Sequence, residues 1–218
     1  MQALPKEQIA QAVRQGGEAY DARFRVLVGE VSWGRLPEAV RARFSKRLAG
    51  TRSAIYPGVI REIRFSRAGW LLAQSCRLIG SPLPIFRDTG VPATVSVSED
   101  HGSGGQCWTR IYGRKHGFPQ VIHSAKRFAG KSGLEEYLGR GIGMALKVAA
   151  LNDGLEFRSD HYFVEIGRLR LRLPHWIGPG QTLVRHRDLG EGKFEFSLQL
   201  VHPLLGELVY QSGIFRDG

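Results

Sequence analysis

A β-hairpin is predicted by residues 91–112, VPATVSVSEDHGSGGQCWTRIY. In its first half, apolar residues at 91, 93, 95 and 97 alternate with Thr94, Ser96 and Ser98, which is the period-two pattern of a strand with one buried face. Residues 100–105, DHGSGG, are typical of a turn, and residues 107–112 then return as a second strand. We therefore predict two antiparallel strands joined by this turn.

Strand patterns continue on both sides of the hairpin. Downstream, alternating runs occur at Val121–Phe128, Leu134–Leu138, Gly143–Ala150, Gly154–Ile166, Leu169–Leu173, Gln181–Asp188, Lys193–Val201 and Leu208–Phe215. Upstream, Ser53–Phe65 is predicted as a strand, a break at Pro57-Gly58 and a second strand. Short strands at regular intervals, separated by turn signals, indicate a closed barrel or a sandwich.

Helical patterns occur in the N-terminal part and in one mid-chain segment. Lys6–Gln15 and Glu18–Val28 have apolar residues at helical spacing, and a third helix is predicted from Leu36-Pro37-Glu38 to Gly50. Gly69–Ile79 is apolar on too many sides for a surface helix, so we expect it to cover the mouth or side of the sheet as a lid.

These patterns predict the α+β class, mainly antiparallel β. We expect a barrel or strongly curved sheet with N-terminal helices and one mid-chain helix packed against it. Residues 1–218 are expected to form a single domain, with a helical part at 1–50 and a β-rich part at 51–218 that includes the helix near 69–79.

Composition excludes several classes of protein. A chain of 218 residues can bury roughly 70% of its unfolded surface, and 42% hydrophobic content argues against wholesale disorder. Two cysteines are too few for a disulfide scaffold or a four-cysteine zinc site. No apolar run reaches the ~18–20 residues of a membrane span, and Met1–Gly16 lacks a secretory pattern. We expect a cytoplasmic location, with a membrane-peripheral one as the alternative.

The net charge of +11 is concentrated in residues 35–77, where ten basic residues accompany two acids. Such a surface attracts phosphate on nucleic acid, anionic lipid or a phosphorylated ligand. Absence of zinc-finger, RNP and leucine-zipper patterns argues against nucleic acid. An anionic membrane surface remains a candidate partner, and the alternative is a solvated helix face. The candidate contact residues are Arg41, Arg43, Arg47, Arg61 and Arg64.

A series of short motifs resembles a known family. In chain order these are Leu36-Pro37-x-x-Val40-Arg41, Trp108-x-Arg110-x-Tyr112-Gly113, Leu155-x-Phe157, Leu173-Pro174-x-Trp176-Ile177-Gly178-Pro179 and His202-Pro203-Leu204-Leu205-Gly206. The chain resembles domain-of-unknown-function family 4166 over about residues 20–216. That family also occurs fused to saccharopine-dehydrogenase-like oxidoreductases, so the resemblance implies a stand-alone β-rich domain and an oxidoreductase as a candidate partner. It implies no catalytic residues.

A ligand-binding face is predicted on the second strand of the hairpin. Period-two geometry places Trp108, Arg110 and Tyr112 on one face, with Glu99 on the partner strand. An arginine between two aromatic rings with a carboxylate opposite can hold a polar head and stack an apolar body. The alternative is a structural Arg110–Glu99 salt bridge at the barrel end, with Trp108 in the core.

Candidate catalytic residues are His123, His161 and Glu165. Both histidines lie in predicted strands, as does His186, and could point inward, while His161 and Glu165 are four residues apart on one strand face. The alternative is a buried histidine satisfied by a neighbour. No His-x-His or His-x-x-x-His pair occurs, so no metal site is predicted, and no motif calls for a cofactor.

Three functions remain open from the sequence. We favour a binding or carrier domain that encloses a lipophilic or lipid-like small molecule in a β-barrel cavity. The first alternative is a cofactor-independent enzyme of the isomerase, cyclase or dehydratase type, with a buried His or Glu in the same cavity. The second is a peripheral-membrane or partner-docking module.

Overall fold

The computed structural model describes residues 20–174 and 178–218, and within them the chain forms one eleven-stranded antiparallel sheet. The strands are β1 (Ser53–Phe65), β2 (Pro92–Asp100), β3 (Gly105–Tyr112), β4 (Gln120–Arg127), β5 (Leu134–Gly139), β6 (Ile142–Leu151), β7 (Gly154–Ile166), β8 (Leu169–Arg172), β9 (Gln181–Gly190), β10 (Lys193–His202) and β11 (Gly206–Arg216). The hairpin predicted at residues 91–112 is β2 and β3.

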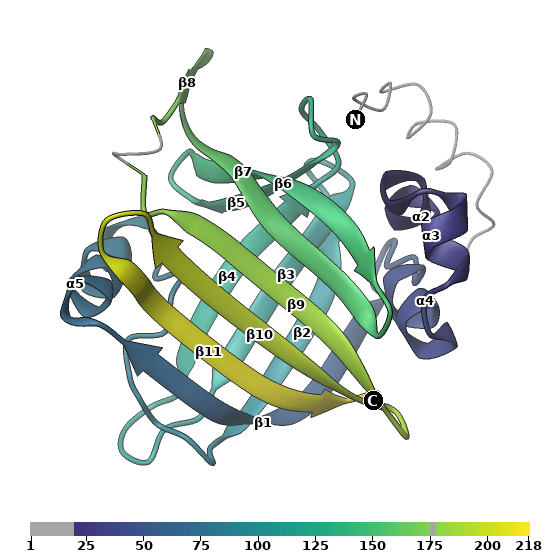
Figure 1. Cartoon of the computed structure of the whole chain (residues 1–218), viewed down its shortest axis with the longest axis horizontal. Coiled ribbons are helices and arrows are strands. Elements are labelled where there is room, and N and C mark those ends of the chain that lie inside the picture. The colour runs from purple at the N-terminus through teal and green to yellow at the C-terminus, as the bar shows by residue number, and fades with distance from the viewer. Residues whose placement is uncertain (1–19, 175–177) are drawn as a thin grey trace.

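The sheet closes into a barrel because β7 pairs with both β6 and β9 (Figure 1). All strands described except β8 belong to the barrel, and β8 extends from β7 as an outer hairpin. The predicted class, a mainly antiparallel barrel with short helices, is confirmed. Closure gives each barrel strand a hydrogen-bonded neighbour on both sides, whereas the two sheets of a sandwich would have unpaired edge strands.

The predicted break at Pro57-Gly58 is wrong, since β1 continues through both residues. The first half of β1 pairs with β2 and the second half with β11, and the halves overlap at Gly58–Val59. A methyl group on Gly58 would overlap the backbone oxygen of Ile214 on β11. Glycine therefore permits a close approach at this crossing, and the strand continues through it.

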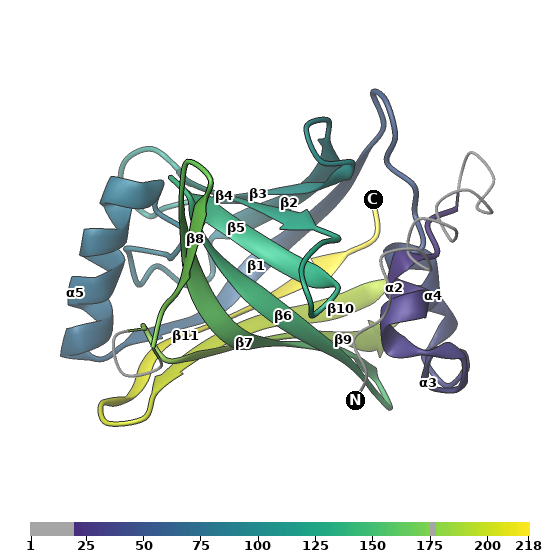
Figure 2. The ribbon, with the colours of Figure 1, turned by 90° about the horizontal axis from the view of Figure 1, so that it is seen from above.

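Helices cover the two ends of the barrel (Figures 1 and 2). One end carries α2 (Arg23–Val28), α3 (Glu30–Gly34) and α4 (Glu38–Phe44), and the other carries α5 (Arg67–Ser75), which continues as the 3-10 turn η1 (Cys76–Ile79). The predicted mid-chain helix near 69–79 is α5 with η1. Within the described residues, no helix is long and apolar enough to cross a bilayer.

The N-terminal helices are shorter than predicted. α2 begins at Arg23 because Tyr20 forms a β-bridge with Lys46, and α4 ends at Phe44 for the same reason. The helix predicted at Lys6–Gln15 lies outside the described residues. The segment between Phe44 and Gly50 therefore ties the helical part to the barrel without continuing the helix.

Apolar side chains fill the barrel interior with the period of two that the sequence predicts. On β10, for example, residues 194, 196, 198 and 200 are buried and alternate with more exposed positions. Aromatic rings gather at the α4 end, where Phe24 packs edge-on against Phe44, Phe128 and Phe157. Side chains leave a cavity of about 30 Å³ at that end, whereas the α5 end encloses a much larger space.

Candidate functional site

A cavity of about 410 Å³ lies inside the barrel at the α5 end. This volume falls within the range of about 300–1,000 Å³ typical of small-molecule sites. Its walls come from β6, β9 and β10 and are mostly apolar, including Ile142, Met144, Val184, Leu198 and Leu200. The cavity can therefore take a ligand that buries substantial apolar surface.

α5 forms the roof of the cavity. The Oγ of Ser66 accepts the backbone N–H of Gly69 and caps the helix N-terminus. A methyl group on Gly69 would overlap the backbone oxygen of Leu208, so glycine lets α5 sit directly on β11. This contact turns Leu72 and Cys76 toward the cavity.

Three segments frame the mouth beside α5. They are the chain after η1 with Pro82 and Leu83, the β8–β9 connection with Gly178 and Pro179, and the β10–β11 turn with Leu205. All three connect strands or helices, so the mouth is made of loops and the wall of strands. Ligand sites of barrels commonly have this arrangement, in which a rigid scaffold carries variable loops.

The cavity floor carries a polar cluster, formed by Arg110 on β3, Ser124 and Lys126 on β4, and Glu136 on β5. The Lys126 ammonium lies 3.1 Å from a carboxylate oxygen of Glu136. One terminal nitrogen of the Arg110 guanidinium donates to Ser124 Oγ at 3.0 Å, and Ser124 also contributes to lowering the pKa of Glu136. We call these four residues the floor cluster.

The floor cluster contains two basic side chains and one carboxylate. Burial lowers the pKa of Lys126, and so does the charge of Arg110, whereas the carboxylate of Glu136 acts to raise it. Burial would raise the pKa of Glu136, but Lys126 and Arg110 together hold it below its usual value. Glu136 is therefore ionised, and it is the one carboxylate among the described residues that line the cavity.

Arg110 is the group that the floor cluster leaves incompletely paired. Its side chain is 6% exposed, and its Nε is buried without a hydrogen-bond partner among the described residues. Buried guanidinium groups normally have all their donors satisfied, because an unpaired buried donor costs about 1–3 kcal/mol. An acceptor from a ligand or from water is therefore expected here.

A second polar group on the wall is already satisfied. The Tyr162 hydroxyl and Thr182 Oγ1 lie 2.5 Å apart, and Ser159 Oγ accepts the Thr182 backbone N–H at 2.9 Å. Burial raises the pKa of Tyr162 to about 12, so it stays protonated at neutral pH. This wall therefore offers a hydroxyl but no charge.

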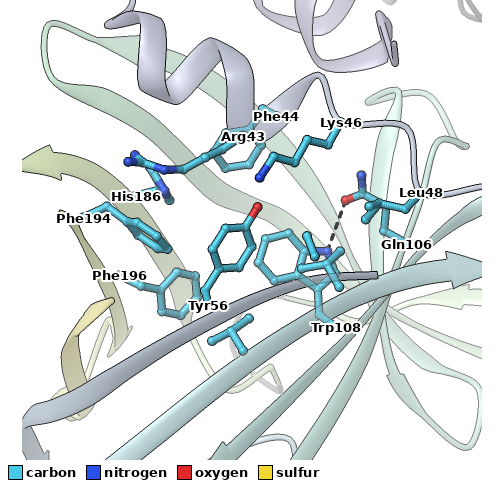
Figure 3. Close-up of a pocket in the computed structure, with 13 residues that line it drawn as sticks. Arg43, Phe44, Lys46, Leu48, Tyr56, Gln106, Trp108, His186, Phe194 and Phe196 are labelled. Carbon is cyan, nitrogen blue, oxygen red and sulfur yellow. Dashed lines mark hydrogen bonds between the residues drawn. The ribbon is translucent and has the colours of Figure 1, made fainter. Parts of the chain in front are cut away.

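A smaller cavity of about 30 Å³ lies toward the α4 end, lined largely by aromatic rings and aliphatic side chains (Figure 3). Phe196 lines both cavities and so lies between them. Space of this size holds water and excludes a ligand of several atoms. We therefore place the candidate binding site in the larger cavity.

Ion pairs close the smaller cavity. Arg43 of α4 contacts Asp188 and Asp217, each at 2.8 Å. His186 beside it is stacked on Phe194 with ring centroids 4.4 Å apart. Burial, with the charge of Arg43, lowers the pKa of His186 to about 3, so its ring is neutral at physiological pH.

The predicted ligand-binding face is only partly assembled at the cavity. Arg110 lines it, as expected. Trp108 lies toward the smaller cavity, where its Nε1 donates to Gln106 Oε1 at 3.2 Å and the Lys126 ammonium sits 4.6 Å from its ring centre. Tyr112 is fully buried and accepts a hydrogen bond of 2.5 Å from Gln211.

Glu99 does not face Arg110, contrary to the prediction. It pairs with Gln106, four residues away from Arg110 along β3. Its carboxylate accepts the backbone N–H of Gly50 at 2.8 Å and lies 3.5 Å from His101. The carboxylate that accompanies Arg110 is Glu136, which comes from a different hairpin.

The candidate catalytic residues lie outside the cavity. His123 is exposed on the outer face of β4, with Nδ1 3.2 Å from Thr109 Oγ1. His161 contacts Asp160 at 2.8 Å, and Glu165 accepts the Tyr137 hydroxyl at 2.9 Å. The structure therefore does not assemble a His–Glu pair from these residues, and they do not support the enzymatic alternative.

The five arginines predicted to contact an anionic surface do not share one face. Arg41, Arg43 and Arg47 lie on or after α4 at one end of the barrel, and Arg43 is buried in its ion pairs. Arg61 and Arg64 lie on β1, where Arg64 pairs with Glu62 and with Glu207 at 3.2 Å. The five arginines therefore belong to two separate parts of the fold, and their contact with an anionic surface stays a prediction.

Three residues of the floor cluster were missed from the sequence, namely Ser124, Lys126 and Glu136. Ser124 and Lys126 share a strand face with the buried Ile122, but Val121 on the other face is also apolar, so the sequence pattern alone did not identify the inner face. Among the described residues, no three His, Cys, Asp or Glu side chains gather in a way that could hold a metal ion.

Comparison with known proteins gives one match. The model of the family described as a domain of unknown function (DUF4166) matches residues 36–215, within the stretch over which the sequence motifs predict it. No curated protein matches the chain, and neither does any solved structure.

Proposed function

The chain belongs to the DUF4166 family, whose description names no activity, and we propose that it is a binding or carrier protein that holds a lipophilic small molecule in the barrel cavity. The observation that carries this proposal is the cavity of about 410 Å³ with mostly apolar walls under a helical roof. The cavity at the α4 end has a volume of only about 30 Å³, so the larger volume stands out as a place for a ligand.

The balance of the lining supports a ligand that is mainly apolar. Side chains such as Leu72, Met144 and Leu198 make up most of the lining. The polar groups are fewer, and they belong to the floor cluster, Tyr162, Thr182, Cys76 and His202. Apolar burial contributes about 25 cal/mol per Å², so a hydrocarbon body filling this space would supply most of the affinity. A strongly polar ligand would leave its own groups unpaired against these walls.

Binding of the uncharged dye Nile red tests the proposal. We expect saturable fluorescence enhancement at one dye per chain, and displacement of the dye by dodecanol. Met144→Trp places an indole in the cavity and should weaken Nile red binding about tenfold or more. Val121→Trp on the exposed outer face of β4 is the matched control and should bind as the wild type does. Failure of both probes to bind wild-type protein would refute the proposal.

A second candidate function is docking to an anionic membrane, and the outer face of α5 favours it. Trp70 and Leu71 are exposed there, flanked by exposed Arg67. No acidic residue occurs between Glu62 and Asp88, and α5 and η1 themselves carry basic side chains, Arg67 and Arg77, beside these apolar ones.

Vesicle sedimentation tests the docking surface. The wild type should bind phosphatidylserine-containing vesicles more strongly than neutral phosphatidylcholine vesicles, and Trp70→Ala/Leu71→Ala should lose this binding. Val31→Ala removes an exposed apolar side chain at the opposite end of the barrel and is the control. Binding that ignores lipid charge, or that survives the double substitution, would rule this function out.

A further inference from the structure

We propose that the cavity ligand carries a single anionic group, a carboxylate, and that this group binds the Arg110 guanidinium in the floor cluster at the inner end of the cavity. The inference rests on the proposed function and narrows it from lipophilic molecules in general to monoanionic amphiphiles. Its basis is the charge, the hydrogen bonding and the position of the floor cluster.

The first argument is charge balance. Arg110, Lys126 and Glu136 are each at most 6% exposed, and they bring two basic side chains and one carboxylate into the barrel. Glu136 is bonded directly to Lys126, so among the described residues Arg110 is the basic group left without a carboxylate in contact. An uncompensated buried charge is costly, and one negative charge from a ligand restores neutrality.

The second argument is hydrogen bonding. Arg110 uses one terminal nitrogen on Ser124, and its buried Nε has no partner among the described residues. A guanidinium presents its donors in a planar fork that matches the two oxygens of a carboxylate. The free Nε is therefore a donor for which a carboxylate supplies the matching acceptor.

The third argument is position. Phe196 separates the larger cavity from the smaller one, and Lys126 reaches over Trp108, which lines the smaller one. The floor cluster thus lies deep in the barrel, while α5 covers the opposite, outer end. A ligand with its acid at the floor places its hydrocarbon body along the apolar walls and beneath α5.

Other head groups fit the floor cluster less well. Water in an empty cavity can satisfy the Arg110 Nε, and a ligand that displaces this water must replace its acceptor. A hydrocarbon end would leave the guanidinium unpaired, and a cationic head would meet two cations. A dianion would carry excess charge, because Glu136 already neutralises Lys126.

Calorimetric titration of the full chain with three probes of equal chain length tests the inference. The probes are dodecanoate, dodecanol and dodecyltrimethylammonium. We expect dodecanoate to bind the wild type about 10- to 100-fold more tightly than dodecanol, which is the range for a hydrogen bond to a charged group. The cationic probe should bind most weakly.

Arg110→Met separates recognition of the head from packing of the tail. The variant should lose about 10- to 100-fold in affinity for dodecanoate and keep its affinity for dodecanol, which also reports that the barrel is folded. Arg77→Met on η1 removes an exposed positive charge near the same end of the barrel and should leave the preference unchanged.

The outcomes distinguish this inference from the proposed function. Equal affinity of wild-type protein for dodecanoate and dodecanol would overturn the inference and leave the binding function standing. A parallel loss of both probes in a folded Arg110→Met variant would assign Arg110 a packing role and would also overturn it. Absence of binding by any probe would refute the proposed function itself. If Arg110→Met fails to fold, the preference of the wild type alone decides.

Discussion

Replacing His186 with phenylalanine should remove part of the sensitivity of the protein to acid. The imidazole is 5% exposed and lies between the rings of Phe44 and Phe194. Burial and the neighbouring Arg43 guanidinium lower its pKa to about 3, although the carboxylates of Asp188 and Asp217 act in the opposite direction. A phenyl ring keeps the aromatic packing, and the adjoining cavity of about 30 Å³ provides room for it.

The expected magnitude follows from proton linkage. The pKa of His186 is about 3 in the folded protein and takes its ordinary value of 6.5 in the unfolded chain. Between these values the unfolded chain binds a proton that the folded protein does not, so stability falls as the pH falls below 6.5. From pH 7 to pH 4.5 the loss is about 2.5 kcal/mol, at about 1.4 kcal/mol per pH unit. Because pH 4.5 is above the folded pKa, this figure barely depends on the exact value near 3.

Urea unfolding at pH 7.0 and pH 4.5 measures the effect. The free energy of unfolding of His186→Phe, relative to wild type, should rise by about 2.5 kcal/mol between the two pH values. Carboxylates that titrate in the same range affect both proteins and cancel in this difference. Val121→Phe adds a phenyl ring to the exposed outer face of β4 without removing a titrating group, and as the control it should show no such rise. A constant difference for His186→Phe would refute the conclusion that His186 is buried in its neutral form.

Two further predictions concern the roof of the cavity. Gly69→Ala should lower the free energy of unfolding, measured with urea, by about 1–3 kcal/mol, because the new methyl group overlaps the backbone of Leu208. In the control Gly34→Ala the methyl group meets no neighbour, so its effect should be close to zero. Equal effects of the two substitutions would contradict the close packing of α5. The Cys76 thiol lines the cavity, and burial raises its pKa. A ligand in the cavity would cover this thiol, so saturating dodecanol should slow alkylation of Cys76 by iodoacetamide at pH 8.5 without slowing that of Cys107. Protection of both thiols, or of neither, would place the ligand elsewhere.

Period-two patterns predicted the strands well because each barrel strand has one apolar and one more polar face. The predicted strand Gly154–Ile166 begins and ends with β7, and the hairpin at residues 91–112 pairs as expected. The error at Pro57-Gly58 has a physical cause. The Pro-Gly dipeptide by itself favours a turn, whereas in the barrel this segment is held in a continuous strand by its pairing with β2 on one side and β11 on the other.

The candidate site was harder to predict because it depends on which face of each strand points inward. In β4, Ile122 alternates with Val121 and His123, so both faces carry an apolar residue and the pattern does not choose between them. Lysine is rarely buried, so the sequence gives no reason to place Lys126 inside the barrel. Its pairing with Glu136 requires the register between β4 and β5, which a single sequence does not contain.

A bulge explains why His161 faces away from the cavity. Counting by two from Leu155 and Phe157 would place residue 161 inside the barrel. Opposite the step from Ala145 to Leu146, β7 carries the extra residue Asp160, so the alternation shifts by one. Tyr162 is therefore inside the barrel and lines the cavity, and His161 lies outside. A shift of one residue therefore places the Tyr162 hydroxyl, which is already hydrogen-bonded, in the cavity in place of the His161 imidazole.

The two ends of the barrel differ in a way that bears on how a ligand would enter. At one end, Arg43 ties α4 to β9 and to the C-terminal segment through two ion pairs, and Phe44 packs beneath it. Opening that end would leave a buried charge uncompensated. At the other end, α5 lies on β11 with exposed apolar side chains and without a buried ion pair among the described residues. Displacing α5 is therefore the less costly opening. An amphiphile whose carboxylate binds Arg110 would enter there with its charged end first, and its hydrocarbon end would come to rest under the helix.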